Sequence, residues 1–229
     1  MRTKEELKMI VNFALQIYGL KDVKRTGWNF NPSVGGGTVS IHDEVTIHNK
    51  GERTGATTIR SVRYPESVAA HAWSATILGW LLATGREDLC LDKLVKLLLV
   101  HDDPEVKTGD LVLAYLSGEE LQEARRKKRE GEEAAIAELA AFLPHDLGMK
   151  YLMIQADCMA KTSREAMFAK QIDGLDVLIQ AIIYAKRGER VRPREFLESV
   201  RPTIKDHELK IVFEILEGMV EELERREGG

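Results

Sequence analysis

Apolar residues recur along most of the chain at the spacing of a helix that buries one face. Residues 3–19 form the first predicted helix, and one stripe of it carries Leu7, Ile10, Val11, Ala14 and Leu15. The same periodicity predicts further helices over residues 66–84, 91–102, 118–143, 146–161, 163–187 and 206–227. Pro144 is expected to end one of them and Gly188 another, because both residues disfavour continued helix.

The helical pattern is interrupted between residues 29 and 62. NFNPSVGGG is rich in turn formers, and TVSIHDEVTIH then alternates as a strand or hairpin does. We therefore expect an all-α helical bundle with a small β-hairpin-like insertion near residues 29–62. A single domain over residues 1–229 is expected to include that insertion and a C-terminal helix at 206–227.

Composition narrows the class of protein. The chain has 229 residues, 44% of them hydrophobic and 31% charged, which suits one sizeable soluble domain. A net charge of −4 gives no reason to expect nucleic-acid binding, and acids flank the basic run RRKKR. The N-terminus shows no signal-peptide core and no apolar stretch is long enough for a membrane span, so a cytoplasmic protein is expected. Cys90 and Cys158 match no zinc spacing and are predicted to be reduced core thiols.

The segment VHDDPEVKTGDL, residues 100–111, carries the first chemical signal. It follows a helix that is apolar almost all round, so His101 and Asp102 lie at the C-terminal end of a buried helix. The helix dipole is negative there and disfavours another carboxylate. Asp102 therefore needs a cation, and no Lys or Arg follows before Lys107. A divalent metal ion is the other candidate.

Two more helices carry polar groups on apolar faces. His71 lies on an apolar stripe and, taken alone, is more commonly a hydrogen-bonded core histidine than a ligand. Asp173 shares its face with small apolar side chains, where a carboxylate is costly unless it is paired or metal-bound. Asp176, one turn on, is the competing acid. Two imidazoles and two carboxylates suit Mn²⁺, Co²⁺, Fe²⁺, Ni²⁺ or Mg²⁺ better than a structural zinc.

Four blocks in order resemble a known family. They are LKDVKRTGW (20–28), RYPESVAAHA (63–72), HDDPEVKTGD (101–110) and SREAMFAKQID (163–173). Their residues and spacing resemble the H…HD…D signature of the HD-domain metal phosphohydrolases, and more closely the 5′-deoxynucleotidase branch. The resemblance covers nearly the whole chain except residues 29–62 and the C-terminal tail.

The resemblance implies a metal site and roles for the residues around it. One divalent cation would be held by His71, His101, Asp102 and Asp173. Glu105 would take a proton from the attacking water, and Asp110 would contact the nucleoside sugar or assist catalysis. Arg25 would contact phosphate, with Arg63 as a second candidate, and Trp28 would stack on a base or simply pack in the core. The alternative for the two acids is a solvated loop carboxylate, which a nearby metal makes less favoured. Without the resemblance, a surface ion pair is the favoured interpretation of each arginine.

The chain departs from the family pattern beside the first ligand. Where the family has Glu-His-Ser, this chain has Ala70 and Ala72 around His71. A carboxylate that would orient His71 is therefore expected to be missing, which would loosen the site. The lysine common after the last ligand is replaced by Gly174, and the 29–62 insertion lies between two blocks that flank the expected pocket.

The resulting prediction is a metal-dependent phosphohydrolase that removes phosphate from a nucleoside 5′-monophosphate, with a deoxyribonucleotide favoured. One alternative is a phosphodiesterase or a nucleoside polyphosphate or pyrophosphate hydrolase, which usually calls for more pocket Lys and Arg than the sequence offers. Another is a non-catalytic helical domain in which the metal is a staple and a nucleotide or protein is bound. Neither nucleic acid nor membrane is expected as a partner.

A homodimer is also expected. The C-terminal helix is amphipathic, with an apolar stripe that consists of Leu209, Ile211, Val212, Ile215, Leu216 and Met219. That stripe would either pair with a second copy or pack on the core of its own chain.

Overall fold

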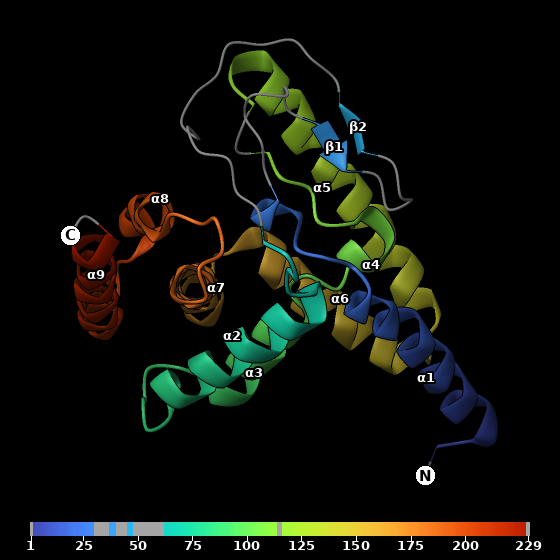
Figure 1. Cartoon of the computed structure of the whole chain (residues 1–229). Coiled ribbons are helices and arrows are strands. Elements are labelled where there is room, and N and C mark those ends of the chain that lie inside the picture. Colours follow the sequence, from blue (N-terminus) through green and yellow to red (C-terminus); the bar gives the residue numbers. More distant parts are fainter. Residues whose placement is uncertain (1, 30–36, 40–44, 48–61, 114–115, 228–229) are drawn as a thin grey trace.

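A computed structural model describes residues 2–29, 37–39, 45–47, 62–113 and 116–227, and these confirm the all-α class. Figure 1 shows the arrangement of the helices. The helices are α1 (Lys4–Ile17), α2 (Val68–Ala83), α3 (Leu91–Val100), α4 (Glu105–Thr108), α5 (Gly118–Ala141), α6 (His145–Ala160), α7 (Arg164–Lys186), α8 (Pro193–Val200) and α9 (His207–Glu227). Short 3₁₀ turns lie at Tyr18–Lys21, Thr26–Trp28 and Arg201–Thr203.

Each predicted helix has an observed counterpart, and two observed helices have no prediction. The four-residue α4 and the eight-residue α8 are both too short to show a periodic apolar stripe. Within the predicted insertion, β1 (Gly37–Val39) pairs antiparallel with β2 (Val45–Ile47). The other residues from 30 to 61 lie outside the described part of the chain.

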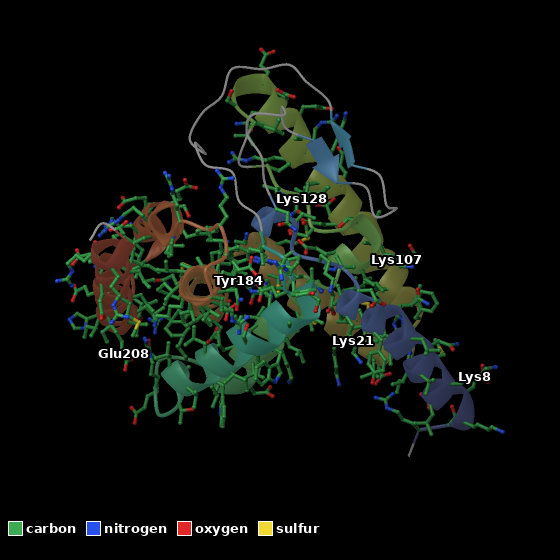
Figure 2. The ribbon with its side chains drawn as sticks, in the orientation of Figure 1. Lys8, Lys21, Lys107, Lys128, Tyr184 and Glu208 are labelled. Atoms are coloured by element: carbon green, nitrogen blue, oxygen red, sulfur yellow. The ribbon has the colours of Figure 1, made fainter. Side chains whose placement is uncertain are left out.

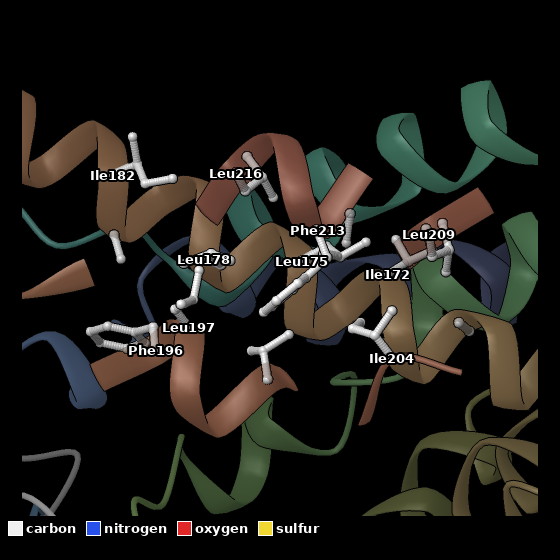
Figure 3. Close-up of a cluster of buried hydrophobic side chains, with 14 of the residues drawn as sticks. Ile172, Leu175, Leu178, Ile182, Phe196, Leu197, Ile204, Leu209, Phe213 and Leu216 are labelled. Carbon is white, nitrogen blue, oxygen red and sulfur yellow. The ribbon is translucent and has the colours of Figure 1, made fainter. Parts of the chain in front are cut away.

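Helix α7 lies at the centre of the main core, between α2 and α3 on one side and α8 and α9 on the other (Figure 1). Its residues Ile172, Leu175 and Leu178 are fully buried, and Figure 3 shows them among side chains of α8 and α9. The predicted burial of this helix on two sides is confirmed. Burying each of these side chains is worth roughly 1.5–3 kcal/mol, so the core holds α7 firmly in place.

Serine caps set the start of the two helices that carry His71 and Asp173. The Ser67 hydroxyl accepts a hydrogen bond from the backbone N–H of Ala70 at the start of α2, and Ser163 accepts one from Ala166 at the start of α7. A cap of this kind fixes where a helix begins and hence which side chains face the core.

Gly79 allows α2 and α3 to approach closely. A Cβ atom at this position would overlap the Cδ1 atom of Leu98 on α3 and would also contact Ile172 on α7. The absence of a side chain therefore brings the helix that carries His71 against the helix that ends at His101.

Backbone pairing joins the RTGW segment to the start of α2. Lys24 and Ser67 form an isolated antiparallel bridge, and the backbone N–H of Arg25 donates to the carbonyl of Glu66 at 3.0 Å. The Asn29 Oδ1 atom accepts a hydrogen bond from the backbone N–H of Val62 at 2.8 Å. The two ends of the 29–62 segment are therefore tied together beside α2.

The structure corrects one expectation about the cysteines. Both cysteines are free, but Cys90 is exposed and so is not a core thiol.

The apolar side chains of α9 fall on two faces. Those that pack on the core of the chain itself are Leu209, Phe213, Leu216 and Val220, whereas Ile211, Ile215 and Met219 are exposed. Within the described residues, no helix is long and apolar enough to cross a membrane.

Candidate metal centre and pocket

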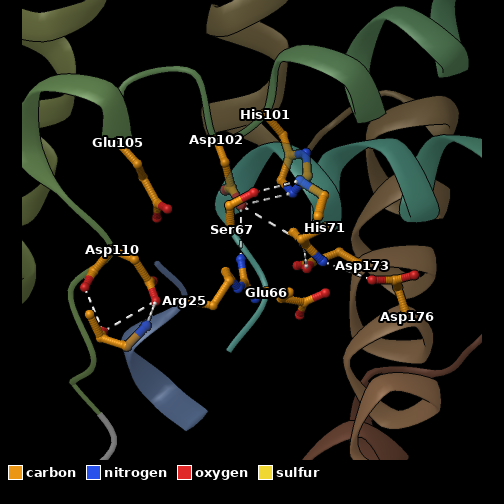
Figure 4. Close-up of polar contacts among 12 residues, drawn as sticks. Arg25, Glu66, Ser67, His71, His101, Asp102, Glu105, Asp110, Asp173 and Asp176 are labelled. Carbon is orange, nitrogen blue, oxygen red and sulfur yellow. Dashed lines mark hydrogen bonds and ion pairs between the residues drawn. The ribbon is translucent and has the colours of Figure 1, made fainter. Parts of the chain in front are cut away.

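The imidazoles of His71 and His101 lie edge to face at the junction of α2 and α3, with ring centroids 5.3 Å apart (Figure 4). His71 Nδ1 lies 2.8 Å from Asp176 Oδ2, and His101 Nδ1 lies 2.8 Å from the carbonyl oxygen of Leu98. In a neutral imidazole whose Nδ1 donates to an acceptor, the Nε2 lone pair is available to a metal. Both rings are therefore oriented with Nε2 toward the same space.

Two carboxylates lie at the same point. Asp173 Oδ1 is 3.2 Å from His71 Nε2, and Asp102 Oδ2 is 3.3 Å from His101 Nε2 and 3.8 Å from His71 Nε2. One ligand atom from each of His71, His101 and Asp173 lies within 4.8 Å of the others. The structure thus gathers all four residues that the sequence nominated, from α2, α7 and the end of α3.

The donor set fits a divalent cation. Both Nε2 atoms are buried and make no hydrogen bond with any described residue. Leaving such atoms without a partner costs free energy unless something binds there. Burial of His71 disfavours its charged form, but Asp173 and Asp176 outweigh burial and raise its pKa to about 10. The space between the four side chains therefore attracts positive charge.

Arg25 supplies a cation that the sequence did not place beside Asp102. Its Nη1 donates to Asp102 Oδ2 at 2.9 Å, although 77 positions separate the two residues. Burial opposes the charge on Arg25, but Asp102, Asp110 and Asp173 outweigh it and raise its pKa above the ordinary value. The guanidinium is therefore held at the edge of the site with further N–H groups for other acceptors.

Glu105 faces a pocket of about 360 Å³ that opens beside the four residues. It is 4% exposed, and its Oε2 atom is buried without a hydrogen-bond partner among the described residues. Burial, then the charges of Asp102 and Asp110, raise its pKa to about 9. Lys128 reaches the pocket from α5 (Figure 2), and its Nζ lies 3.6 Å from Glu105 Oε1.

Asp110 also lines the pocket and fixes the segment that carries Arg25. Its Oδ2 accepts hydrogen bonds from the Thr26 backbone N–H at 2.6 Å and from Thr26 Oγ1 at 3.2 Å. The same hydroxyl lies 2.7 Å from the carbonyl oxygen of Asp110. This pairing anchors the residue next to Arg25 across 84 positions of sequence.

Two predicted substrate residues are not brought to the pocket. Trp28 is 2% exposed and packs against Tyr184 and Phe196, with both ring centroids 5.0 Å away. Its Nε1 donates to Glu66 Oε1 at 3.1 Å, so the packing alternative is the one the structure favours. Arg63 is exposed and is not among the residues that line the pocket.

The roles of several polar residues of the site did not follow from the sequence, in which Asp176 was considered only as a competitor of Asp173. Asp176 orients His71, so the expectation of a missing carboxylate was wrong: the acid comes from α7, and Ala70 beside the ligand is exposed. The pocket also holds Lys128, Lys161 and Lys170 in addition to Arg25, more cations than the sequence suggested. Lys170 and Asp176 stand three residues before and after Asp173, a spacing that places them near it on a helix.

The chain belongs to the HD-domain family, because the model of that family matches residues 50–210, more than half of the sequence. It is similar to the protein called 5′-deoxynucleotidase HDDC2 of Bos taurus, at 34% identity over 125 residues, which is 55% of this chain and 57% of that protein. The protein of the same name from Xenopus laevis is 26% identical over 203 residues, 88% of this chain and 83% of that protein. The chain thus spans less than two thirds of the length of the mammalian relatives it matches.

Solved structures share the fold. A protein described as a predicted metal-dependent phosphohydrolase, from Magnetospirillum magnetotacticum MS-1, aligns with a TM-score of 0.64 and 22% identity over 97% of this chain and 95% of that chain. A conserved hypothetical protein from Pyrococcus furiosus aligns with a TM-score of 0.58 and 23% identity over 90% of this chain and 98% of that chain. An HD domain implies a divalent metal, and His71, His101 and Asp173 form the candidate site here.

Proposed function

We propose that this protein is a metal-dependent phosphohydrolase that removes phosphate from a nucleoside 5′-monophosphate, with deoxyribonucleotides favoured. The observation that carries the proposal is the convergence of His71, His101 and Asp173, with Asp102 Oδ2 3.3 Å from His101 Nε2, beside the pocket that Glu105 and Arg25 line. The relatives named 5′-deoxynucleotidases support the choice of substrate.

His71, His101, Asp102 and Asp173 would hold one divalent cation. Their two nitrogens and two carboxylates favour Mn²⁺, Co²⁺, Fe²⁺, Ni²⁺ or Mg²⁺. Such a cation, when bound, lowers the pKa of water and offsets negative charge on phosphoryl oxygens.

Glu105 is the proposed general base. It lines the pocket together with His101, Asp102 and Asp173, and its pKa of about 9 without metal would fall beside a divalent charge. Arg25 would donate to the phosphoryl oxygens through the N–H groups that Asp102 does not use. Asp110 holds Thr26 in place, and its other carboxylate oxygen is the proposed contact for the nucleoside sugar.

The charges in the pocket support a single phosphate on the substrate. Among the described residues, four cations and five acids line it, and three of these cations lie within ion-pair distance of an acid: Arg25 with Asp102, Lys128 with Glu105 and Lys170 with Asp173. The pocket lysines support the polyphosphate alternative better than the sequence analysis suggested. These pairings, however, leave little free positive charge for a second or third phosphate.

A non-catalytic metal staple is less well supported. A staple needs the four ligands but has no use for Glu105, whose buried and unpartnered Oε2 is costly to keep.

The test is phosphate release from a panel of nucleoside monophosphates, diphosphates and cyclic diesters with added Mn²⁺ or Co²⁺. Wild-type protein should release phosphate from monophosphates, and Glu105→Gln should lower kcat by about 10²–10⁴-fold while bound metal is unchanged. Glu138→Gln is the matched control, because Glu138 lies on the exposed side of α5 and pairs with Lys107. Release only from diphosphates or diesters would favour the second function, and release from no substrate would favour a binding role.

The homodimer and the cytoplasmic location remain proposals. The exposed apolar side chains of Ile211, Ile215 and Met219 on α9 support association with a second copy.

A further inference from the structure

Lys161 adopts a backbone conformation that disfavours a side chain. It ends α6 with φ of 53° and ψ of 38°, and it is the one non-glycine residue with positive φ in the described segments. Glycine is the usual residue at such a helix end, because any Cβ is strained there. Backbone strain of this kind tends to gather at functional sites.

The side chain of Lys161 lines the same pocket as the candidate metal centre. The two other lysines of the pocket are each paired: Lys170 Nζ lies 2.8 Å from Asp173 Oδ2, and Lys128 Nζ lies 3.6 Å from Glu105 Oε1. Lys161 makes no ion pair or side-chain hydrogen bond with any residue that the structure describes. It is exposed at the pocket, so a ligand can reach it.

Burial and neighbouring charge disfavour the ammonium form of Lys161 on balance. Partial loss of hydration and the neighbouring charge of Lys170 lower its pKa, while Asp173 and Glu132 oppose this less strongly. An ammonium group in that position is stabilised when an anion joins it. Among the described residues that line the pocket, Arg25, Lys128 and Lys170 each have an acid within ion-pair distance, whereas Lys161 has none and is free to bind an incoming anion.

We propose that Lys161 binds a non-bridging oxygen of the substrate phosphate, and therefore also of the free phosphate product. This inference rests on the proposed function. In it, the Nζ group donates a charge-assisted hydrogen bond to the phosphoryl group, which Arg25 would also contact. Because the contact is made to substrate and product alike, it lowers KM and strengthens product inhibition more than it raises kcat.

The test uses Lys161→Gly in the full, metal-loaded protein. Glycine relieves the positive-φ strain, so thermal stability should be equal to or above that of the wild type. The KM for the best monophosphate of the panel should rise about ten- to hundredfold, and the inhibition constant of inorganic phosphate should rise by a similar factor. Lys161→Asn, which tolerates this conformation, should behave as the glycine variant does, and Lys161→Arg should stay near wild type.

Lys150→Ala is the control, because Lys150 lies on the same helix and is exposed but does not line the pocket. An active wild type whose KM and phosphate inhibition are unchanged in Lys161→Gly would overturn this inference and leave the proposed function standing. A wild type that releases phosphate from no monophosphate would overturn both. A parallel loss of stability and bound metal in Lys161→Gly would show a structural role and also overturn the inference.

Discussion

At the scale of single residues, His71 depends on a carboxylate that is not its sequence neighbour. Asp176 Oδ2 lies 2.8 Å from His71 Nδ1, one turn beyond Asp173 on α7. A single helix therefore supplies both a candidate ligand and the group that sets the tautomer of another. This removes the need for an acid at position 70.

Replacing Asp176 by Ala should weaken metal binding by about 10–100-fold, because His71 would lose the partner that fixes its ring. The dissociation constant for Mn²⁺ or Co²⁺ can be measured by competition with a chromogenic chelator. Asp92→Ala is the control, since Asp92 is 76% exposed and pairs only with Lys96 one turn away. Equal affinity in the wild type and Asp176→Ala would show that His71 is oriented by other contacts.

Sequence reasoning found residues that break an apolar pattern and missed those whose role depends on distant packing. His71 and Asp173 could be proposed because each is polar on an apolar helix face, and His101 and Asp102 because they end a buried helix where a carboxylate is disfavoured. Lys128 sits in a charged run, and nothing in that run shows which side faces the pocket. Trp28 suits a core or a binding site equally well by its chemistry.

At the scale of elements, the close contact of α2 and α3 positions the two imidazoles. Gly79 lies two turns beyond His71 on α2, and Leu98 lies one turn before His101. The shared contact with Ile172 extends this junction to α7. The helix positions could be predicted from periodicity. This close approach could not, because an isolated glycine in a helical pattern can serve packing, function or a helix end.

Gly79→Ala should destabilise the protein by about 1–3 kcal/mol, since the new methyl overlaps a buried leucine and overpacking outweighs the better helix propensity of alanine. Thermal or urea unfolding measures the change. Gly218→Ala is the matched control: it lies in α9 with no atom near its would-be Cβ, so it should stabilise by about 0.5–1 kcal/mol. A stabilised Gly79→Ala protein would mean that Leu98 moves aside at little cost.

At the scale of the whole molecule, the candidate ligands come from three helices, so a cation would bind the folded chain and not the unfolded one. Binding would then add about 2.7 kcal/mol of stability at a metal concentration 100 times the dissociation constant. Metal and proton compete for His71 Nε2, whose pKa is raised to about 10 in the metal-free protein. Without metal, the stability that this proton supplies is fully present below the unfolded pKa near 6.5 and is lost as pH rises through 10.

The increase in unfolding temperature on adding Co²⁺ should therefore grow from pH 6.5 to pH 8.5, with apparent affinity rising about tenfold per pH unit for one displaced proton. Differential scanning calorimetry with and without a chelator measures it. His71→Ala should abolish both the shift and its pH dependence. An affinity for Co²⁺ that does not vary with pH would show that no proton is displaced from His71.

The hydrogen bond between Asn29 and Val62 affects which lengths of the intervening segment the fold can accommodate. Both ends of the intervening segment leave the bundle at one place, secured by the Lys24–Ser67 bridge and the hydrogen bond to Asn29. The entropy of closing a loop grows only slowly with its length, so segments of very different size can depart from and return to this point at similar thermodynamic cost. The length of this segment can therefore vary while α2, α3 and α7 keep the candidate metal ligands in place.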